Sequence, residues 1–241
     1  IYFGLFFGGQ YGLLPEFFAQ HLGNPSLLIL PKVVNIAAGC FVLGLLLMRW
    51  LPEAVHERSR SDAAAADLEK LATTDGMTGL INRRHFEVLA RAEWARFQRY
   101  GRPLSLLFID LDGFKSVNDS HGHLCGSRAL VEVGAVIRAC ARETDAVARF
   151  GGDEFAVVLP DTDEAGARAV AARIRDRVAR HVFLTSVGLT VRLTASIGVA
   201  THVDASASAD ELLAAADAAM YWVKGHGKNN IHVAEGTLLQ R

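Results

Sequence analysis

Two short, mainly apolar runs flank the segment Gly151-Gly152-Asp153-Glu154, and this pattern constrains the fold more than any other feature of the chain. The runs cover residues 147–150 and 155–159, and four residues between two such runs predict a β-hairpin. The glycines leave room for a phosphate to approach the backbone, and the two acids present carboxylates beside it. The pattern therefore predicts an antiparallel pair of strands with an acidic turn.

A further acid stands at the end of another predicted strand. Asp110 closes the run of residues 104–109, which is apolar except for Ser105, and we therefore expect a strand in the middle of a sheet. Taken alone, the acidic turn could be a plain hairpin with acids facing water. A carboxylate at a strand end and others in a turn can together hold divalent metal against a nucleoside triphosphate. Asp110 therefore favours a metal site.

Helix and strand patterns alternate from Asp75 onward. This alternation, with at least one hairpin, predicts a sheet with helices on its faces, in the α+β or mixed α/β class. The other predicted elements are helices at residues 83–99, 127–141, 163–182 and 209–223 and strands at 191–199 and 231–233.

The first fifty residues differ in composition from the rest. The whole chain of 241 residues has a net charge of -1, but residues 1–48 carry only two charged side chains, Glu16 and Lys32. We expect residues 1–50 to hold one or more transmembrane segments at the end of a truncated membrane region. Core helices of a soluble domain are the alternative.

The main candidate span covers residues 27–48, with a second at 1–14. Twenty-two residues of helix measure roughly 33 Å, about one hydrocarbon core. Arg49 and Trp50 follow, as a basic stop and an interfacial aromatic residue would. The positive-inside rule then places everything after residue 49 in the cytoplasm, which for a bacterial protein means an anchor in the inner membrane.

The remainder of the chain divides into three predicted parts. Residues 51–74 are rich in Ala, Glu and Arg and predict a helical linker that pairs with its twin in a homodimer or stays single. A folded domain covers residues 75–236, and residues 237–241 form a tail. The near-neutral charge gives no indication of a nucleic-acid polymer as partner.

Five blocks of sequence, in order, resemble the GGDEF family of diguanylate cyclases. The blocks are DGMTGLINRR at 75–84, FIDLDGFKSVND at 108–119, RFGGDEF at 149–155, SIGVA at 196–200 and DAAMYWVKGHGKNN at 217–230. The resemblance implies a five-stranded sheet with surrounding helices, similar to the palm of polymerases and adenylate cyclases. Met77 stands where the family usually has Leu.

The resemblance also implies a reaction. Two GTP molecules would condense to cyclic di-GMP and two pyrophosphates, with two divalent cations, Mg²⁺ or Mn²⁺, in each active site. Asp110, Asp153 and the carbonyl of Leu111 would hold the metal. Asp153, with Glu154 beside it, would receive the proton of the attacking hydroxyl.

The substrate-binding residues implied by the resemblance surround these acids. Three lysines would neutralise the triphosphate, although each is also consistent with an ordinary surface position. Asn118 would contact guanine, and His123 would line the same pocket or pack beside it. The lysines are Lys115, Lys224 and Lys228, and the backbone of Gly151 and Gly152 would approach phosphate.

Ser127 departs from the family pattern. It replaces the Asp that usually accepts hydrogen bonds from guanine, and a hydroxyl is a weaker, neutral partner for two donors. We expect a weaker preference for guanine, as in the hybrid promiscuous GGDEF subgroup that also makes cyclic GMP-AMP from GTP and ATP. A catalytically inactive regulator that binds GTP or cyclic di-GMP is the further alternative.

The resemblance also implies a product-inhibition site, formed by residues outside the proposed metal and substrate sites. Arg142 and Asp145 match the family's R-x-x-D pattern before the signature, and Arg173 lies where a second inhibitory arginine commonly stands. Guanidinium groups suit phosphate and the edge of guanine. Charges that pair at helix ends are the alternative interpretation.

Overall fold

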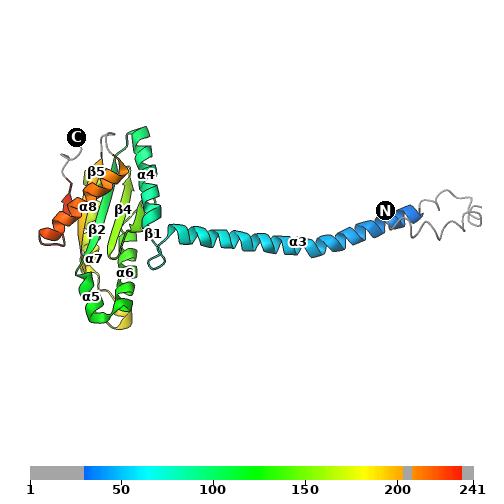
Figure 1. Ribbon diagram of the computed structural model, residues 1–241, viewed down its shortest axis with the longest axis horizontal. Helices are drawn as coiled ribbons and strands as arrows, with labels where there is room; N and C mark the ends of the chain where they lie inside the picture. Colours follow the sequence, from blue (N-terminus) through cyan, green and yellow to red (C-terminus); the bar gives the residue numbers. More distant parts are fainter. Residues whose placement is uncertain (1–29, 203–207, 235–241) are drawn as a thin grey trace, which may run out of the picture. The chain divides into compact units, whose positions relative to one another are not determined.

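The structure is a computed structural model that describes residues 30–202 and 208–234. The chain separates into two compact units, residues 1–65 and residues 66–241. The second unit contains a twisted sheet with helices on both faces (Figure 1).

Six strands form the sheet in the order β1-β3-β4-β2-β5-β6. β2 lies between β4 and β5 and is antiparallel to both, so the predicted central strand is confirmed. The resemblance implied five strands, and the sixth is the two-residue β1, which pairs in parallel with β3. The strands are β1 (Ile81–Asn82), β2 (Leu104–Asp112), β3 (Ala146–Arg149), β4 (Glu154–Pro160), β5 (Thr194–His202) and β6 (Ile231–Val233).

The helices of the second unit follow the predicted pattern, with one addition. The eight-residue helix α5, which begins directly after β2, was not predicted because it is short and lies between two glycines. The helices are α4 (Arg83–Tyr100), α5 (Phe114–His121), α6 (His123–Arg138), α7 (Glu164–Arg180) and α8 (Ala209–Gly225), with a 3₁₀ turn, η2 (Thr185–Val187).

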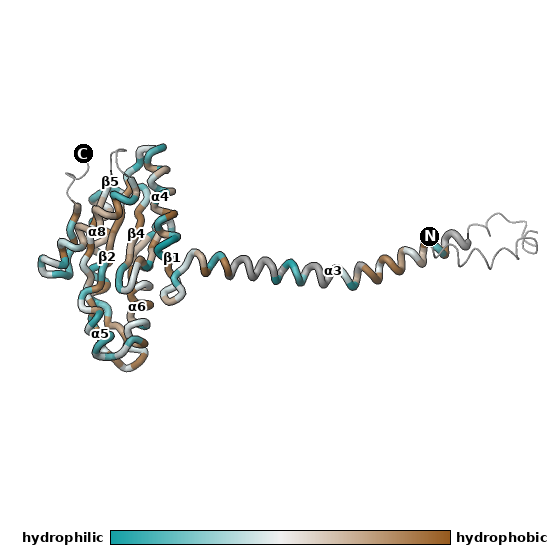
Figure 2. Tube along the Cα trace, in the orientation of Figure 1, coloured by the Kyte–Doolittle hydropathy of each residue, from teal (hydrophilic) through white to brown (hydrophobic). Residues whose placement is uncertain are grey.

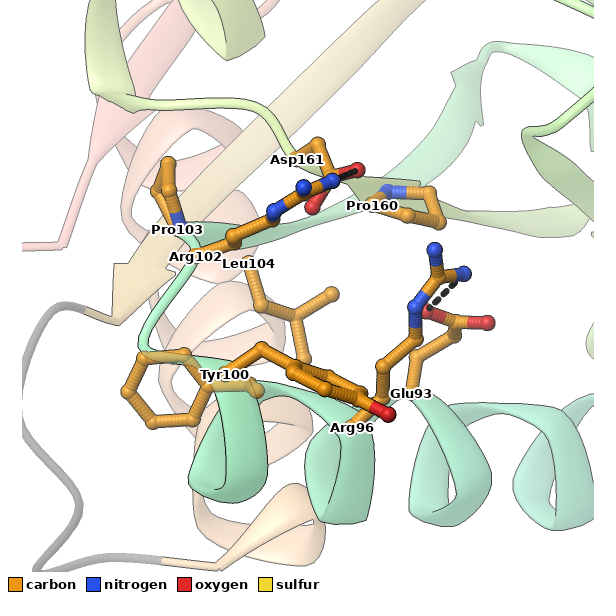
Figure 3. Close-up of a pocket in the computed structure, with 9 residues that line it drawn as sticks. Glu93, Arg96, Tyr100, Arg102, Pro103, Leu104, Pro160 and Asp161 are labelled. Atoms are coloured by element: carbon orange, nitrogen blue, oxygen red, sulfur yellow. Dashed lines mark hydrogen bonds and ion pairs between the residues drawn. The ribbon is translucent and has the colours of Figure 1, made fainter.

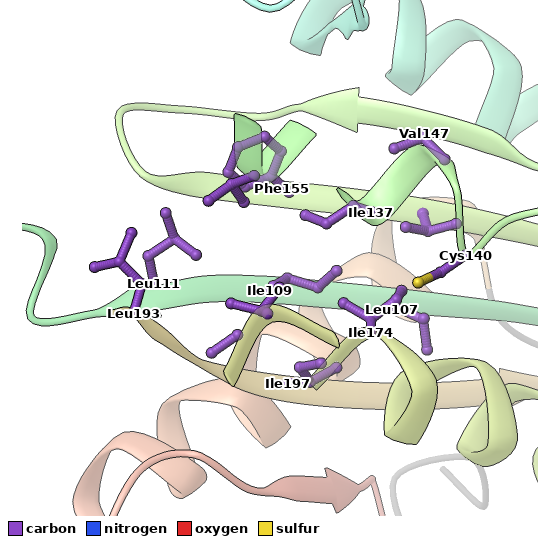
Figure 4. Close-up of a cluster of buried hydrophobic side chains, with 14 of the residues drawn as sticks. Leu107, Ile109, Leu111, Ile137, Cys140, Val147, Phe155, Ile174, Leu193 and Ile197 are labelled. Atoms are coloured by element: carbon purple, nitrogen blue, oxygen red, sulfur yellow. The ribbon is translucent and has the colours of Figure 1, made fainter. Parts of the chain in front are cut away.

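Two apolar cores lie on opposite faces of the sheet, because alternate side chains of a strand point to opposite sides. In β2, Leu107, Ile109 and Leu111 pack in one core with α5, α6 and α7 (Figure 4). Leu106 and Phe108 pack in the other core with α4 and α8. Every residue of β2 is therefore assigned to a face, and Asp110 and Asp112 belong to the face of α4 and α8.

The helix starts have clear local causes. The side chain of Asn82 accepts a hydrogen bond from the backbone N–H of His85 and begins α4. Ser208 and Glu211 form a reciprocal capping box at the start of α8. These caps fix where α4 and α8 begin over the face that carries the acids.

The helix α3 (Leu30–Thr73) runs through both the predicted span and the predicted linker. Its hydropathy falls from the apolar stretch before Arg49 to the polar stretch after it (Figure 2). Over the part of the chain that the structure describes, no helix is long and apolar enough to cross a membrane, so the span predicted at 27–48 is not supported. Residues 27–29 of that predicted span lie outside the described residues. The predicted span at 1–14 and the tail at 237–241 lie outside the described residues.

Candidate active site

The acids predicted to bind metal meet at one end of the β2–β4 pair. Asp110 and Glu154 are directly opposite each other in the antiparallel ladder, and both belong to the face of α4 and α8. The backbone N–H of Leu111 donates to the carbonyl oxygen of Asp153 at 3.3 Å. The turn of residues 151–154, called the signature turn below, is thus attached to the end of β2. Asp110, Asp153 and Glu154 therefore lie close to one another.

The hairpin predicted at residues 151–154 is confirmed. The backbone N–H groups of Phe150 and Gly151 both donate to the carbonyl of Glu154, at 2.9 and 3.3 Å. A Cβ at Gly151 would lie 2.7 Å from a carboxylate oxygen of Glu154, so a side chain there would displace this carboxylate from its position beside the turn. The N–H of Gly151 is engaged within the turn.

The ammonium group of Lys224 lies at the end of β2. Its Nζ is 2.5 Å from Oδ1 of Asp110, 3.1 Å from Oδ1 of Asp112 and 3.2 Å from the carbonyl oxygen of Leu111. Burial by itself lowers the pKa of Lys224, but the two carboxylates outweigh it and raise the pKa above its usual value. The lysine is therefore held in its charged form.

A glycine in β5 brings Lys224 to this position. A Cβ at Gly198 would overlap backbone atoms of Ala216 and Met220, so glycine lets α8 lie directly on β5. Lys224 is in the last turn of α8 and reaches across to β2. Gly198 of the SIGVA block thus acts through packing.

Asp112 was missed by the sequence analysis, although it follows Asp110 at the spacing of one strand face. Its carboxylate accepts hydrogen bonds from Ser196 at 2.7 Å, from Thr194 at 2.8 Å and from the backbone N–H of Asn229 at 3.0 Å. Burial alone raises the pKa of Asp112, but these bonds and Lys224 outweigh it and lower the pKa. Asp112 therefore binds β5 and the loop after α8 to the end of β2.

Asp110 and Glu154 have the opposite electrostatic balance. Burial raises the pKa of Asp110, and the charges of Asp153 and Asp112 add to this increase, which Lys224 only partly offsets. Burial also raises the pKa of Glu154, followed by the charges of Asp110, Asp217 and Asp153. The site thus has an excess of carboxylates over cations.

Arg149 and Asp75, which the sequence analysis also missed, form an ion pair that supports the signature turn. Arg149 donates to the carbonyl of Gly152 through Nε at 3.1 Å and Nη2 at 2.8 Å, and its Nη1 lies 3.3 Å from both carboxylate oxygens of Asp75. Asp75 also accepts from the backbone and side chain of Thr78. The first motif of the domain therefore positions the signature turn.

The predicted base-binding residues lie on α5 and α6. A Cβ at Gly126 would overlap the amide oxygen of Asn118, which places Asn118 against the helix turn that carries Ser127. Ser127 is half-buried, and His123 is exposed at the first position of α6. Lys115 is exposed on α5, three residues after Asp112.

Lys228 lies in the loop that Asp112 holds. Its backbone has φ = 60°, a left-handed conformation, and its side chain is exposed. The neighbouring N–H of Asn229 donates to Asp112, so the loop is fixed while the lysine faces solvent. Lys224 and Lys228 are therefore placed differently, one bound to acids and one exposed.

Comparison with known proteins identifies the family of this domain. Residues 72–230 match the family described as "Diguanylate cyclase, GGDEF domain". The chain belongs to the GGDEF family.

Two curated relatives come from Escherichia coli strain K12. "Probable diguanylate cyclase DgcC" is 37% identical over 167 residues, 69% of this chain and 44% of that protein. "Diguanylate cyclase DgcM" is 37% identical over 180 residues, 75% of this chain and 43% of that protein. The chain thus spans less than half the length of either relative.

A solved structure agrees with the family and the fold. The coiled coil and GGDEF domain of DgcB from Caulobacter crescentus, in complex with c-di-GMP, matches with a TM-score of 0.73. The sequences are 28% identical over 78% of this chain and 99% of that one. The predicted mixed α/β sheet of a GGDEF domain is confirmed.

In this GGDEF domain, the predicted product-inhibition residues share one surface region. The backbone N–H of Arg142 donates to Oδ2 of Asp145 at 2.6 Å, which closes a turn before β3. Arg173 donates through Nε and Nη2 to the carbonyl of Cys140, at 3.1 and 2.6 Å. Asp145 is only 4% exposed, whereas the side chains of Arg142 and Arg173 are exposed. The side chains of Arg142 and Arg173 are thus accessible on this surface, whereas Asp145 is buried within the turn.

The donor set of the GGDEF site fits a magnesium-type ion. Within residues 30–202 and 208–234, no three His, Cys, Asp or Glu side chains converge as a metal-binding group. The available donors are the carboxylate of Asp110 and the carbonyl of Leu111, with Asp153 close by, and the cation that they attract here is the ammonium of Lys224. Mg²⁺ commonly uses one or two carboxylates and takes its other ligands from water and substrate phosphates.

A shallow pocket at the other end of β2 and β4 does not resemble this site. It lies between the end of α4 and residues 102–104 and 160–161 (Figure 3). Arg102 and Asp161 pair there at 3.1 Å, with side chains 65% and 44% exposed. The pocket has no concentration of acids and is separated from the signature turn by the full length of β4.

Proposed function

We propose that this chain is a diguanylate cyclase that condenses two GTP molecules into cyclic di-GMP and two pyrophosphates. The observation that carries the proposal is the meeting of Asp110 and Glu154 as a cross-strand pair, with Asp153 attached to β2 by its own carbonyl. In the proposed reaction, the 3′-hydroxyl of each GTP attacks the α-phosphate of the other, and each attack releases pyrophosphate.

Asp110, Asp153 and the carbonyl of Leu111 would hold two divalent ions, Mg²⁺ or Mn²⁺. Such ions, when bound, stabilise charge on the phosphate oxygens and acidify the attacking hydroxyl. The position of Lys224 supports the proposal, because Asp110 and the carbonyl of Leu111 already attract one cationic group, its ammonium.

The chain's own residues supply the other functions. Asp153 accepts the proton of the 3′-hydroxyl, with Glu154 next to it. Lys115, Lys224 and Lys228 bind the triphosphate, and Asn118 contacts the base. The support for these roles is their position on elements that begin or end beside the acids, at the start of α5, the end of α8 and the following loop.

Catalysis would need two copies of the domain. One site holds one nucleotide, and the product joins two, so two sites must face each other in a homodimer. Activity per chain should fall on dilution as the dimer dissociates. Full specific activity of a chain that stays monomeric would contradict this part of the proposal.

The central experiment is a product analysis. The purified chain is incubated with Mg²⁺ and GTP, with ATP, or with both, and the products are identified by mass. We expect cyclic di-GMP and pyrophosphate in a ratio of one to two from GTP alone. A chain that binds GTP but yields no cyclic dinucleotide would instead be a regulator that only binds nucleotide.

A second candidate activity, synthesis of cyclic GMP-AMP, is favoured by Ser127. A carboxylate accepts both guanine donors, whereas a hydroxyl leaves one of them with a weak partner, so ATP is rejected less strongly. We predict that Ser127→Asp raises the preference for GTP over ATP by about tenfold, the effect of roughly 1.4 kcal/mol. The measurement is the ratio of products from an equimolar mixture, and an unchanged ratio would mean that other residues select the base.

The proposal includes inhibition by cyclic di-GMP at the surface of Arg142 and Arg173. Exposed guanidinium groups on neighbouring segments support it, because they suit phosphate and guanine. We predict that added cyclic di-GMP slows the wild-type reaction and that Arg142→Ala weakens this inhibition about tenfold or more. Equal inhibition of both proteins would remove Arg142 from the inhibitory site.

A further inference from the structure

The three donors of one lysine are directed at three consecutive residues of the proposed metal site. Nζ of Lys224 contacts Asp110, Leu111 and Asp112 at 2.5, 3.2 and 3.1 Å, and the lysine side chain is 21% exposed. An ammonium group has three N–H donors and no acceptor. In this arrangement its donors are engaged with protein oxygens, and none is left for a phosphate.

The contacts of Lys224 include both β2 groups that the proposed function assigns to the metal, the carboxylate of Asp110 and the carbonyl of Leu111. A divalent ion and an ammonium group cannot occupy the same oxygens at these distances, since both are cations that need direct contact. Lys224 and the metal therefore compete for Asp110 and Leu111.

The two carboxylates differ in how much they depend on the lysine. Asp112 keeps hydrogen bonds from Ser196, Thr194 and Asn229 when Lys224 leaves. For Asp110, Lys224 is the hydrogen-bond and ion-pair partner found among the described residues. Release of Lys224 would thus free Asp110 and leave Asp112 in place.

We infer that Lys224 is a removable placeholder in the metal site, which must leave Asp110 and Leu111 before metal binds and which the triphosphate of the nucleotide draws away. The inference rests on the proposed function. It gives one lysine two successive sets of partners, first the site's own acids and then the substrate phosphates. Metal binding and nucleotide binding are thereby coupled, because each removes an obstacle to the other.

The first test measures metal binding without nucleotide, so that no reaction takes place. Mn²⁺ is titrated into the purified 241-residue chain and followed by electron paramagnetic resonance. We expect Lys224→Met, which keeps the length of the side chain and removes its charge, to bind Mn²⁺ at least about tenfold more tightly than wild type. Lys224→Arg keeps the cation and should bind as weakly as wild type.

Lys70→Met is the matched control for the lost charge. Lys70 is exposed in the last turn of α3, has no role in the proposed site and makes no ion pair in the described part of the chain. It should leave the Mn²⁺ affinity within about threefold of wild type, a change below roughly 0.7 kcal/mol. Circular dichroism and the unfolding temperature check that each variant is folded, and Lys224→Gln is the second neutral variant should Lys224→Met be unfolded. A folded neutral variant that binds Mn²⁺ no more tightly than wild type overturns the inference.

The second test adds 3′-deoxy-GTP, which carries the triphosphate but lacks the attacking hydroxyl. We expect the nucleotide to increase the Mn²⁺ affinity of wild type by a larger factor than that of Lys224→Met, in which no lysine has to be displaced. Equal factors in both proteins would overturn the coupling. Wild type that binds no Mn²⁺ even with the nucleotide would instead contradict the proposed function. If Lys224→Met then still binds Mn²⁺ more tightly than wild type, the competition between Lys224 and metal is supported even though the proposed function is not.

Discussion

The two ends of the β2–β4 pair carry the same kind of ion pair in different surroundings. At the signature end, Lys224 pairs with Asp110 and Asp112, whose side chains are 21% and 6% exposed. At the other end, Arg102 and Asp161 pair with side chains 65% and 44% exposed (Figure 3). The comparison indicates that the burial of an ion pair, rather than its mere presence, determines how strongly stability and reactivity depend on that pair.

The origin of the partners also differs between the ends. At the signature end, β5, α8 and the loop after α8 contribute groups to the last residues of β2, more than eighty positions away along the chain. At the other end, the pair joins the two loops that flank β2 and β4 and has no further partner in the described residues. Convergence of distant segments thus creates a partly desolvated acidic site at one end only.

The largest expected effect is on activity at the signature end. We predict that Asp153→Ala lowers the rate of cyclic di-GMP formation by at least about a thousandfold, because it removes the proposed metal ligand and proposed proton acceptor in one step. The rate is measured by chromatography of the nucleotide products. Arg102→Ala, which breaks the exposed pair at the other end, should retain the wild-type rate. Turnover that survives in Asp153→Ala would exclude Asp153 from the mechanism.

The next effect concerns stability. Asp112→Asn should lower the free energy of unfolding by about 2–3 kcal/mol, because a carboxylate with several charge-assisted bonds becomes a neutral amide with two N–H donors of its own. Urea denaturation followed by circular dichroism measures the change. Arg102→Ala should change it by less than about 1 kcal/mol, as expected for an exposed pair. Similar losses in both variants would abolish the contrast between the two ends.

The smallest effect concerns Asp75 and is recognisable by its pH dependence. Burial alone raises the pKa of Asp75, but hydrogen bonds from Thr78 and the guanidinium of Arg149 outweigh it and lower the pKa. A pKa below the unfolded value of about 3.9 means that the carboxylate stabilises the fold above roughly pH 4 and that this contribution is lost as the pH falls through the folded pKa.

Asp75→Asn should therefore lower the unfolding free energy by about 1 kcal/mol at pH 7. The difference from wild type should shrink as the pH is lowered below roughly 4, where Asp75 becomes protonated in both states. Urea denaturation at a series of pH values gives this curve. A difference that stays constant down to pH 2 would show that the charge of Asp75 contributes nothing to stability.

Much of the fold was predictable because its elements are periodic. The alternating residues of β5 and the helical period of α6 indicated strand and helix directly, although the predicted ends were off by a few residues. The strand predicted at 191–199 begins at Thr194, since Val191 belongs to an isolated bridge with Phe183. Boundaries depend on hydrogen bonds to other segments, which a local pattern does not contain.

The site was predictable in part for the same reason. The acids of the turn and Asp110 were found because their motifs stand at strand ends. Asp112, Arg149 and Asp75 were missed, since their importance lies in partners far away in sequence. The membrane span was predicted from apolar length together with Arg49 and Trp50, and no helix in the described part of the chain is long and apolar enough to cross a membrane.

By itself, the sequence determined the alternation of helix and strand, the hairpin with its acidic turn and the membership in the GGDEF family, because each is recognised from short local patterns or their order along the chain. Only the tertiary structure decided that Lys224 lies on Asp110 and Leu111 and that Asp112 holds β5 and the loop after α8 to the end of β2. The physical reason is that the charge balance of a site is set by which distant groups share its desolvated space.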